Sequence, residues 1–397
     1  MNKIELLAPA GDLERAKIAI LYGADAVYVG GKKFSLRARA SNFEMDDIYE
    51  LCRFAKEHNA KVYVTTNIIA HNNDLSGYEE YVLELEKAGV SALIAADIGL
   101  ISRAIKVLTR MEVHASTQLS LSNVEAVKFF KDMGCTRCVL ARECSMNQIE
   151  DICAKSPVEI EVFVHGAMCS SYSGKCVLSN YMTNRDANRG GCAQSCRWSY
   201  KPYDSNKEKV SDNIFTFSSK DLMGIRYLPR MIEAGVASLK VEGRMKTSHY
   251  LSTVMGVYRA AIDEYYATGN ISYEKYEKEL AKCENRKASH GFFEGNVTVN
   301  QQIFDLNNDV ATQEYVASVL DYDEKTNMVK IEQRNYFTID DTLEMVGYDI
   351  EKFNFKVDEF YDEDGNVVTI ANNPKKVLFF KLDRPVKKDY FMRKIKL

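Results

Sequence analysis

The sequence predicts an α/β fold: a (β/α)8 TIM-like barrel with an inserted cysteine-rich loop, followed by a small C-terminal β-barrel domain. Three observations support this prediction. Short β-branched runs alternate with longer helical patterns from the N-terminus onward, as is typical of parallel βα units. A polar segment rich in cysteine and glycine interrupts the alternation after the seventh run. After Asn300 the helical pattern gives way to alternation with a period of two residues.

Eight runs have the length and composition of buried strands, and eight is the number that closes such a barrel. Several of them are rich in the β-branched and aromatic side chains that suit a pleated surface. The predicted strands cover residues 4–8, 26–30, 61–67, 92–96, 112–117, 137–141, 159–164 and 238–242.

Helical patterns occupy the segments between these runs. In the first of them Asp12 can accept hydrogen bonds from the unpaired N–H groups of the first turn, and Leu13, Ala16 and Ile20 form an apolar stripe at three-to-four spacing. Several segments end in a glycine suited to a left-handed cap. The predicted helices cover residues 13–21, 44–58, 76–88, 99–109, 123–133, 145–154 and 220–234.

Two features define the expected domain organisation. We expect a barrel unit over residues 1–300 that contains the insertion at 165–219, and a separate β domain over 301–397. A hairpin that pairs residues 197–203 with 214–217 would close the insertion. Strands are expected in the tail at 314–320, 328–333 and 377–382.

The tail is also electrically divided. Residues 349–366 hold seven acidic and two basic side chains, whereas residues 375–397 hold nine basic and two acidic ones. The basic end could contact a phosphate backbone. Alternatively, its lysines keep an exposed edge strand from aggregating.

Composition narrows the class of protein. With 397 residues, 46% hydrophobic residues and a formal charge of -4, the chain is neither a disordered polyelectrolyte nor a wholly basic nucleic-acid coat. Any contact with nucleic acid must therefore come from a local patch. The N-terminal segment lacks a secretory pattern and no apolar stretch is long enough for a membrane helix, so we expect a cytoplasmic protein without a membrane partner.

Four cysteines in the insertion are the strongest chemical signal. Cys169, Cys176, Cys192 and Cys196 are separated by six, fifteen and three residues. Thiolates favour zinc or iron–sulfur chemistry over hard cations. Structural zinc sites usually bring two close cysteine pairs, and only Cys192 and Cys196 have that spacing. The spacing therefore favours a 4Fe-4S cluster over zinc.

Other cysteines are better explained by packing. Cys135 and Cys138 form a C-x2-C pair, followed by Cys144 and Cys153. Cys138, however, lies inside an apolar predicted strand, and Cys153 lies on the apolar face of the next predicted helix. Free cysteines commonly behave as small buried hydrophobic residues, so we expect these four, together with Cys52 and Cys283, in the core.

Polar residues follow most of the predicted strands, at the end of the barrel where active sites gather. The arginines among them suit planar anions, and the glutamates are candidates for proton transfer, although structural ion pairs would use the same residue types. His165 borders the cysteine loop as a hydrogen-bond donor beside the metal or as a loop cap. The candidate catalytic residues are Glu242, Glu143 and His165, and the candidate substrate-binding residues are Arg37, Arg142, Arg244, Asn67 and Gln118.

Several motifs carry a family resemblance. The segments LLAPAGD at 6–12, VLARE at 139–143, VHGAMCSSYSGKC at 164–176, GGCAQSCRWSY at 190–200, SSKDL at 218–222 and SLKVEGRMK at 238–246 resemble the peptidase U32 family. The resemblance spans residues 1 to about 300, and the tail resembles the small β domain that many members carry. By this resemblance, Cys169, Cys176, Cys192 and Cys196 match the cluster-ligand cysteines of the family.

The resemblance implies a function. Related branches are oxygen-independent hydroxylation factors with a 4Fe-4S cluster, and the chain is most similar to the branch that makes 5-hydroxyuridine at the tRNA wobble position with prephenate. The implied partners are tRNA, prephenate or a similar small dicarboxylate, and a possible homologous partner subunit. A collagenase-like peptidase, a ribosomal RNA hydroxylation factor and a non-catalytic cluster-bearing assembly partner remain alternatives.

Overall fold

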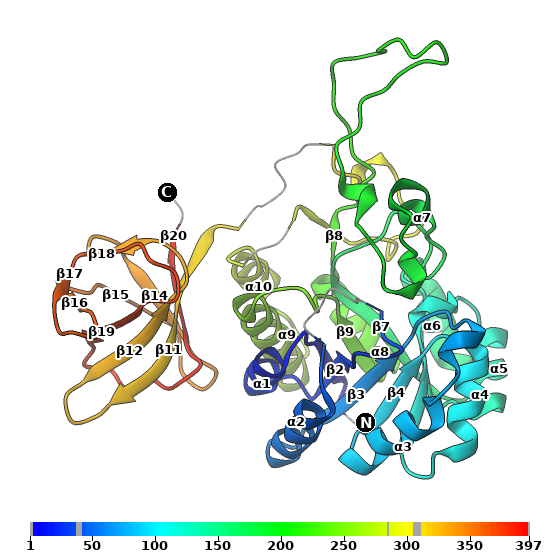
Figure 1. The fold of residues 1–397 in the computed structure, drawn as a ribbon, viewed down its shortest axis with the longest axis horizontal. Coiled ribbons are helices and arrows are strands. Elements are labelled where there is room, and N and C mark those ends of the chain that lie inside the picture. The colour runs from blue at the N-terminus through cyan, green and yellow to red at the C-terminus, as the bar shows by residue number, and fades with distance from the viewer. Residues whose placement is uncertain (1–2, 37–41, 284–285, 305–310, 396–397) are drawn as a thin grey trace.

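Eight parallel strands close into a barrel, as the sequence predicts. The computed structural model describes residues 3–36, 42–283, 286–304 and 311–395. Neighbouring strands pair in chain order, and the barrel closes because β9 pairs in parallel with both β7 and β1 (Figure 1). The barrel strands are β1 (Glu5–Pro9), β2 (Ala26–Gly30), β3 (Lys61–Thr66), β4 (Ala92–Ala95), β5 (Glu112–Ala115), β6 (Arg137–Val139), β7 (Glu159–Gly166) and β9 (Ser238–Val241).

The helices that cover the barrel begin close to the predicted positions. Asp12 caps the first helix, with its Oδ1 accepting a hydrogen bond of 2.9 Å from the Arg15 N–H. Asn123 and Ser145 cap two later helices in the same way. The helices of this layer are α1 (Leu13–Leu21), α2 (Met45–Glu57), α3 (Tyr78–Ala88), α4 (Ile98–Val107), α5 (Val124–Met133), α6 (Met146–Lys155), α8 (Leu228–Glu233), α9 (Ser248–Thr268) and α10 (Tyr273–Leu280).

The predicted helix at 220–234 is wrong in its first half. Residues Asp221–Met223 form the short strand β8, and a helix follows only at α8. Strand β8 pairs antiparallel with the end of β7 and parallel with β10 (Ala288–Ser289). These distant strands supply the hydrogen bonds that a helical turn would otherwise make, so tertiary pairing overrides the local helical pattern.

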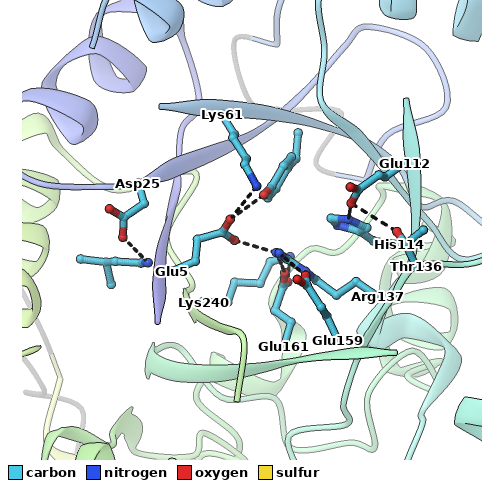
Figure 2. Close-up of polar contacts among 12 residues, drawn as sticks. Glu5, Asp25, Lys61, Glu112, His114, Thr136, Arg137, Glu159, Glu161 and Lys240 are labelled. Atoms are coloured by element: carbon cyan, nitrogen blue, oxygen red, sulfur yellow. Dashed lines mark hydrogen bonds and ion pairs between the residues drawn. The ribbon is translucent and has the colours of Figure 1, made fainter. Parts of the chain in front are cut away.

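A charged network fills one end of the barrel interior (Figure 2). Arg137 contacts Glu5 at 2.6 Å and Glu161 at 3.2 Å, and Glu161 in turn pairs with Lys240 at 2.7 Å. All of these side chains are buried or nearly so. Removing one member of such a network leaves a buried charge unpaired, at a cost of about 3–5 kcal/mol. Because its members come from β1, β6, β7 and β9, the network ties distant strands of the barrel together.

The insertion between β7 and β8 has little regular structure. It contains one short helix, α7 (Leu178–Thr183), and single turns at Ala187–Arg189 and Ser195–Arg197. Tyr200 and Phe215 form an antiparallel bridge with two backbone hydrogen bonds of 2.8 and 3.0 Å, where the sequence predicts a hairpin. Beyond this bridge the chain extends away from the barrel as a long arm (Figure 1).

The C-terminal residues form an antiparallel β domain with its own core. Eight strands follow the order β15-β14-β20-β11-β12-β19-β16-β17, and β13 pairs with β18. The predicted tail strands correspond to β11, β12 and β19. The strands are β11 (Gln313–Asp323), β12 (Met328–Gln333), β13 (Phe337–Thr338), β14 (Leu343–Val346), β15 (Phe353–Phe355), β16 (Phe360–Tyr361), β17 (Val367–Val368), β18 (Ile370–Ala371), β19 (Val377–Lys381) and β20 (Phe391–Ile395).

Buried polar contacts join this domain to the barrel. Arg393 on β20 has no exposed side-chain surface and pairs with Glu344 of its own domain at 2.6 Å and with Glu279 of α10. Tyr22, at the end of α1, donates to the carbonyl oxygens of Val346 and Asp389. These contacts fix the β domain against the outer face of α1, α9 and α10.

The divided charges of the tail partly neutralise each other. Lys387 pairs with Asp349, and Lys376 lies 3.7 Å from Asp362, so basic residues of the last segment contact acidic residues of the preceding one. Among the described residues, no helix is long and apolar enough to cross a membrane.

Candidate active site at the mouth of the barrel

The cysteine-containing insertion is held over the carboxyl ends of the barrel strands. Ser173 binds Glu143 after β6, and the Arg189 guanidinium donates 2.6 Å hydrogen bonds to the Ile69 carbonyl and to Asp74 after β3. Gly174 lies so close to Gln118, after β5, that a Cβ would stand 2.0 Å from its carbonyl oxygen, and its φ of +74° favours glycine. The insertion therefore spans the mouth from the β3 side to the β6 side.

Glu143 and Arg142 both contact this insertion. The Glu143 carboxylate accepts 3.0 Å hydrogen bonds from the Ser173 N–H and from its hydroxyl. Arg142 donates to the Ala167 carbonyl and to the Cys169 Sγ at 3.5 Å, and its guanidinium lies 5.0 Å from the centre of the Phe163 ring. In this arrangement both side chains position the cysteine segment.

Arg244 and Asn67 hold the loop that follows β2. The Arg244 guanidinium donates to the Leu36 carbonyl at 3.0 Å and to the Asn42 Oδ1 at 2.9 Å. It occupies the space above Gly30, where a Cβ would stand 2.1 Å from its Nη2. Asn67 accepts a 3.1 Å hydrogen bond from the Leu36 N–H. The candidate residue Arg37 belongs to this loop but lies outside the described residues.

His165 is turned toward the helix layer. The register between β7 and β9 shifts between Phe163 and His165, and such a bulge re-aims a side chain. The imidazole contacts Tyr258 on α9, with 3.2 Å between Nδ1 and the hydroxyl. Burial, and to a lesser extent the nearby Lys246, lowers the pKa of His165 to about 3. The ring is therefore neutral at physiological pH.

Glu242 and Asp221 are two carboxyl groups at the mouth. Only Glu242 was predicted from the sequence. Glu242 is half-buried after β9, and the Tyr28 hydroxyl lies 3.4 Å from its Oε2. Asp221 begins β8, is only 3% exposed, and pairs with Arg286 at 3.3 Å. Burial raises the pKa of the Asp221 carboxyl group, and the nearby Glu242 raises it further. The positive charges of Lys246, Arg197 and Arg142 lower it. The SSKDL segment was the available signal for Asp221.

The four cysteines of the insertion lie near the surface of the mouth. Cys169 and Cys192 are exposed, and Cys176 and Cys196 are partly buried. Burial raises the pKa of Cys196, and the nearby Cys169 and Cys192 contribute to the same shift. Within the described residues, however, no three His, Cys, Asp or Glu side chains are close enough to hold a single metal ion.

The donor set nevertheless fits a larger soft centre. A mononuclear zinc ion would need sulfurs about 3.8 Å apart, from Zn–S bonds of about 2.3 Å. A 4Fe-4S cluster spreads its four thiolates around a wider body. Four thiols in one loop, with Arg142 directed at one sulfur, are compatible with the wider arrangement.

The remaining cysteines pack as predicted. Five of them are buried, and Cys153 is partly buried. Burial raises the pKa of the Cys135, Cys138 and Cys144 thiols to about 12, so these thiols stay protonated.

Comparison with known proteins identifies the family. Residues 11–303 match Peptidase family U32, and residues 311–393 match the Peptidase family U32 C-terminal domain. The chain belongs to peptidase family U32. This membership agrees with the resemblance of the cysteine and EGRMK motifs.

Relatives in the family have different activities. The chain is 47% identical to tRNA hydroxylation protein P1 of Bacillus subtilis (strain 168), over 99% of this chain and 95% of that protein. It is 42% identical to the 23S rRNA 5-hydroxycytidine C2501 synthase of Escherichia coli (strain K12), over 66% of this chain and 40% of that protein. It is 37% identical to a collagenase of Porphyromonas gingivalis (strain ATCC BAA-308 / W83), over 74% of each chain.

Proposed function

We propose that this U32 protein is an iron–sulfur-dependent tRNA hydroxylation factor. It would convert the wobble uridine to 5-hydroxyuridine without oxygen, with prephenate or a similar dicarboxylate as hydroxyl donor. The observation that carries the proposal is the 47% identity to tRNA hydroxylation protein P1, which extends over 99% of the chain and so includes the C-terminal domain.

Cys169, Cys176, Cys192 and Cys196 would hold the 4Fe-4S cluster, which would supply one-electron chemistry at the mouth. Arg142 supports this assignment because its hydrogen bond to the Cys169 sulfur would stabilise a thiolate. The contacts between Ser173 and Glu143 would keep the cysteine segment in place.

The cationic groups around Asp221 would bind the carboxylates of the donor. Lys246, Arg197 and Arg142 are positive charges that act on this carboxyl group, in addition to its ion-pair partner Arg286. Glu242, which the Tyr28 hydroxyl contacts, would hold or move the proton, with Asp221 as an acidic neighbour. Arg244, by its contacts, would brace the loop after β2 rather than bind the donor.

Nucleoside mass spectrometry of tRNA from a deletion strain tests the substrate. We expect 5-hydroxyuridine derivatives to disappear and to return when the gene is restored. Unchanged derivatives in a strain without a second pathway would refute the tRNA assignment. Anaerobic purification tests the cofactor: the proposal expects a brown protein with about four iron and four sulfide per chain, and a colourless zinc protein would refute it.

Peptidase activity is the second candidate, because a collagenase shares 37% identity over 74% of the chain. The two candidates separate on one variant. If C192S left peptide cleavage intact while 5-hydroxyuridine was lost, cleavage would be independent of the cluster. If purified protein cleaved no gelatin at all, the peptidase candidate would be rejected.

A further inference from the structure

We infer that the outer face of the cysteine insertion is a stacking surface for unpaired bases of RNA. The surface consists of the exposed rings of Tyr172, Tyr181 and Trp198, which are 61%, 85% and 40% exposed. Aromatic rings that are open to solvent can stack on the bases of single-stranded nucleic acid. The inference rests on the proposed function and adds how the RNA would be held.

A cluster of packed aromatic side chains follows Trp198 in the chain. Tyr200, Phe215 and Phe217 pack against one another with ring centres 5.2–5.9 Å apart. Tyr200 follows Trp198 by two residues in the chain. The backbone N–H of Trp198 donates to the Ser195 carbonyl at 3.1 Å. Among the described residues, none of the three exposed rings packs against another ring. The high exposure of Tyr172 and Tyr181 leaves ring surface open to a planar ligand.

The rings also lie beside the proposed cluster ligands. Tyr172 stands between Cys169 and Cys176 in the chain, and Trp198 follows Cys196 by two residues. The helix that carries Tyr181, α7, packs on the turn Ser195–Arg197. A base stacked on this surface would consequently lie close to the mouth, where a neighbouring base could enter.

Charge favours RNA over an apolar partner. Residues 165–200 carry four basic side chains, Lys175, Arg185, Arg189 and Arg197, against the single acidic Asp186, although the whole chain has a net charge of -4. Lys175 and Arg185 form no ion pair within the described part of the chain. Arg189 pairs with Asp74, so Lys175 and Arg185 are the charges that remain for a phosphate backbone. Aromatic rings interleaved with such cations are the usual means of binding single strands.

Filter binding of an anticodon stem-loop to the anaerobically purified full chain tests this surface. Stacking typically contributes enough that Y181A and W198A should each weaken binding about tenfold. W198F keeps a ring and should bind within about twofold of the original chain. F129A is the matched control, because Phe129 is 52% exposed on α5 and should not affect binding.

The outcomes separate this inference from the proposed function. Unchanged affinity in both Y181A and W198A, or an equal loss in F129A, would overturn the stacking surface. Equal binding of a fully paired duplex would do the same, because paired bases cannot stack on these rings. Either result leaves the proposed function intact if the deletion strain lacks 5-hydroxyuridine. Circular dichroism and iron content identify any variant that has lost its fold. If either Y181A or W198A has lost it, the RNA affinity of the other variant decides.

Discussion

Removal of the Glu143 carboxylate should loosen the cysteine segment. In the structure this carboxylate accepts 3.0 Å hydrogen bonds from the N–H and the hydroxyl of Ser173, which is only 3% exposed. The E143A variant leaves both buried donors without that acceptor. Each charge-assisted bond contributes about 1.5–3 kcal/mol, and because Glu143 is only partly buried, water will replace part of it. We therefore expect a total loss of about 3 kcal/mol.

Hydrogen–deuterium exchange of peptides that cover residues 166–176 measures this loss directly. A destabilisation of about 3 kcal/mol corresponds to exchange about 150-fold faster, provided that local opening precedes exchange. E143Q retains an acceptor oxygen without the charge, so about half of the energy and about a tenfold effect are expected. E125A removes an exposed carboxylate on α5 and should leave these peptides unchanged.

Two results would refute the anchoring role. Exchange in E143A that matches the original chain would show that Ser173 does not depend on this carboxylate. Loss of hydroxylation in E143Q with unchanged exchange and iron content would instead assign Glu143 a chemical role in proton transfer.

Three further predictions concern the interface, pH and metal. R393M should lower the free energy of urea-induced unfolding by about 3 kcal/mol, because two carboxylates lose a buried cation. K352M, at the exposed rim of the same interface, should lower it by less than about 1 kcal/mol. Equal losses in the two variants would contradict this prediction. Burial, with Arg393 nearby, lowers the pKa of His249 to about 3, so at this residue only the unfolded chain takes up a proton below about pH 6.5. His249 should therefore contribute about 2 kcal/mol to the loss of stability on going from about pH 7 to about pH 5, in addition to the contribution of His165, and H249F should abolish the His249 share. C169S should reduce the iron content of the anaerobically purified protein while C138A should not, and equal iron in both would count against the ligand assignment.

Much of the barrel could be predicted from the sequence because its signals are local. A run of β-branched residues forms a strand wherever it can be buried on both faces, and Asp12 caps its helix through a contact three residues away. The end of each strand was likewise predictable, and with it the common location of Glu143, Glu242 and Arg244. The predicted helix was wrong at 220–224, because strands more than fifty residues distant in the chain supply the hydrogen bonds there.

Side-chain direction at the mouth was not predictable for a different reason. A strand with strict alternation would direct His165 to the same side as Phe163, toward the interior of the barrel. One shift of register between those two residues turns the imidazole to α9, and no feature of the sequence HGAMC signals it. Contacts that depend on such a shift can be read only from the folded chain.

Asp221 shows why the chemistry of the site is harder to predict than its location. Its burial comes from β8, while the charges that oppose or add to the resulting pKa shift stand on the insertion, after β6 and after β9. No sequence window contains all of these groups, so SSKDL alone predicts a polar turn as readily as a buried acid. The same dependence means that Lys246, which precedes α9 and ends the EGRMK motif, helps to lower the pKa of this carboxyl group against the larger effect of burial, beside the ion pair that Arg286 forms with it. The acid–base behaviour of the mouth is thus a property of four converging elements and not of any one of its residues.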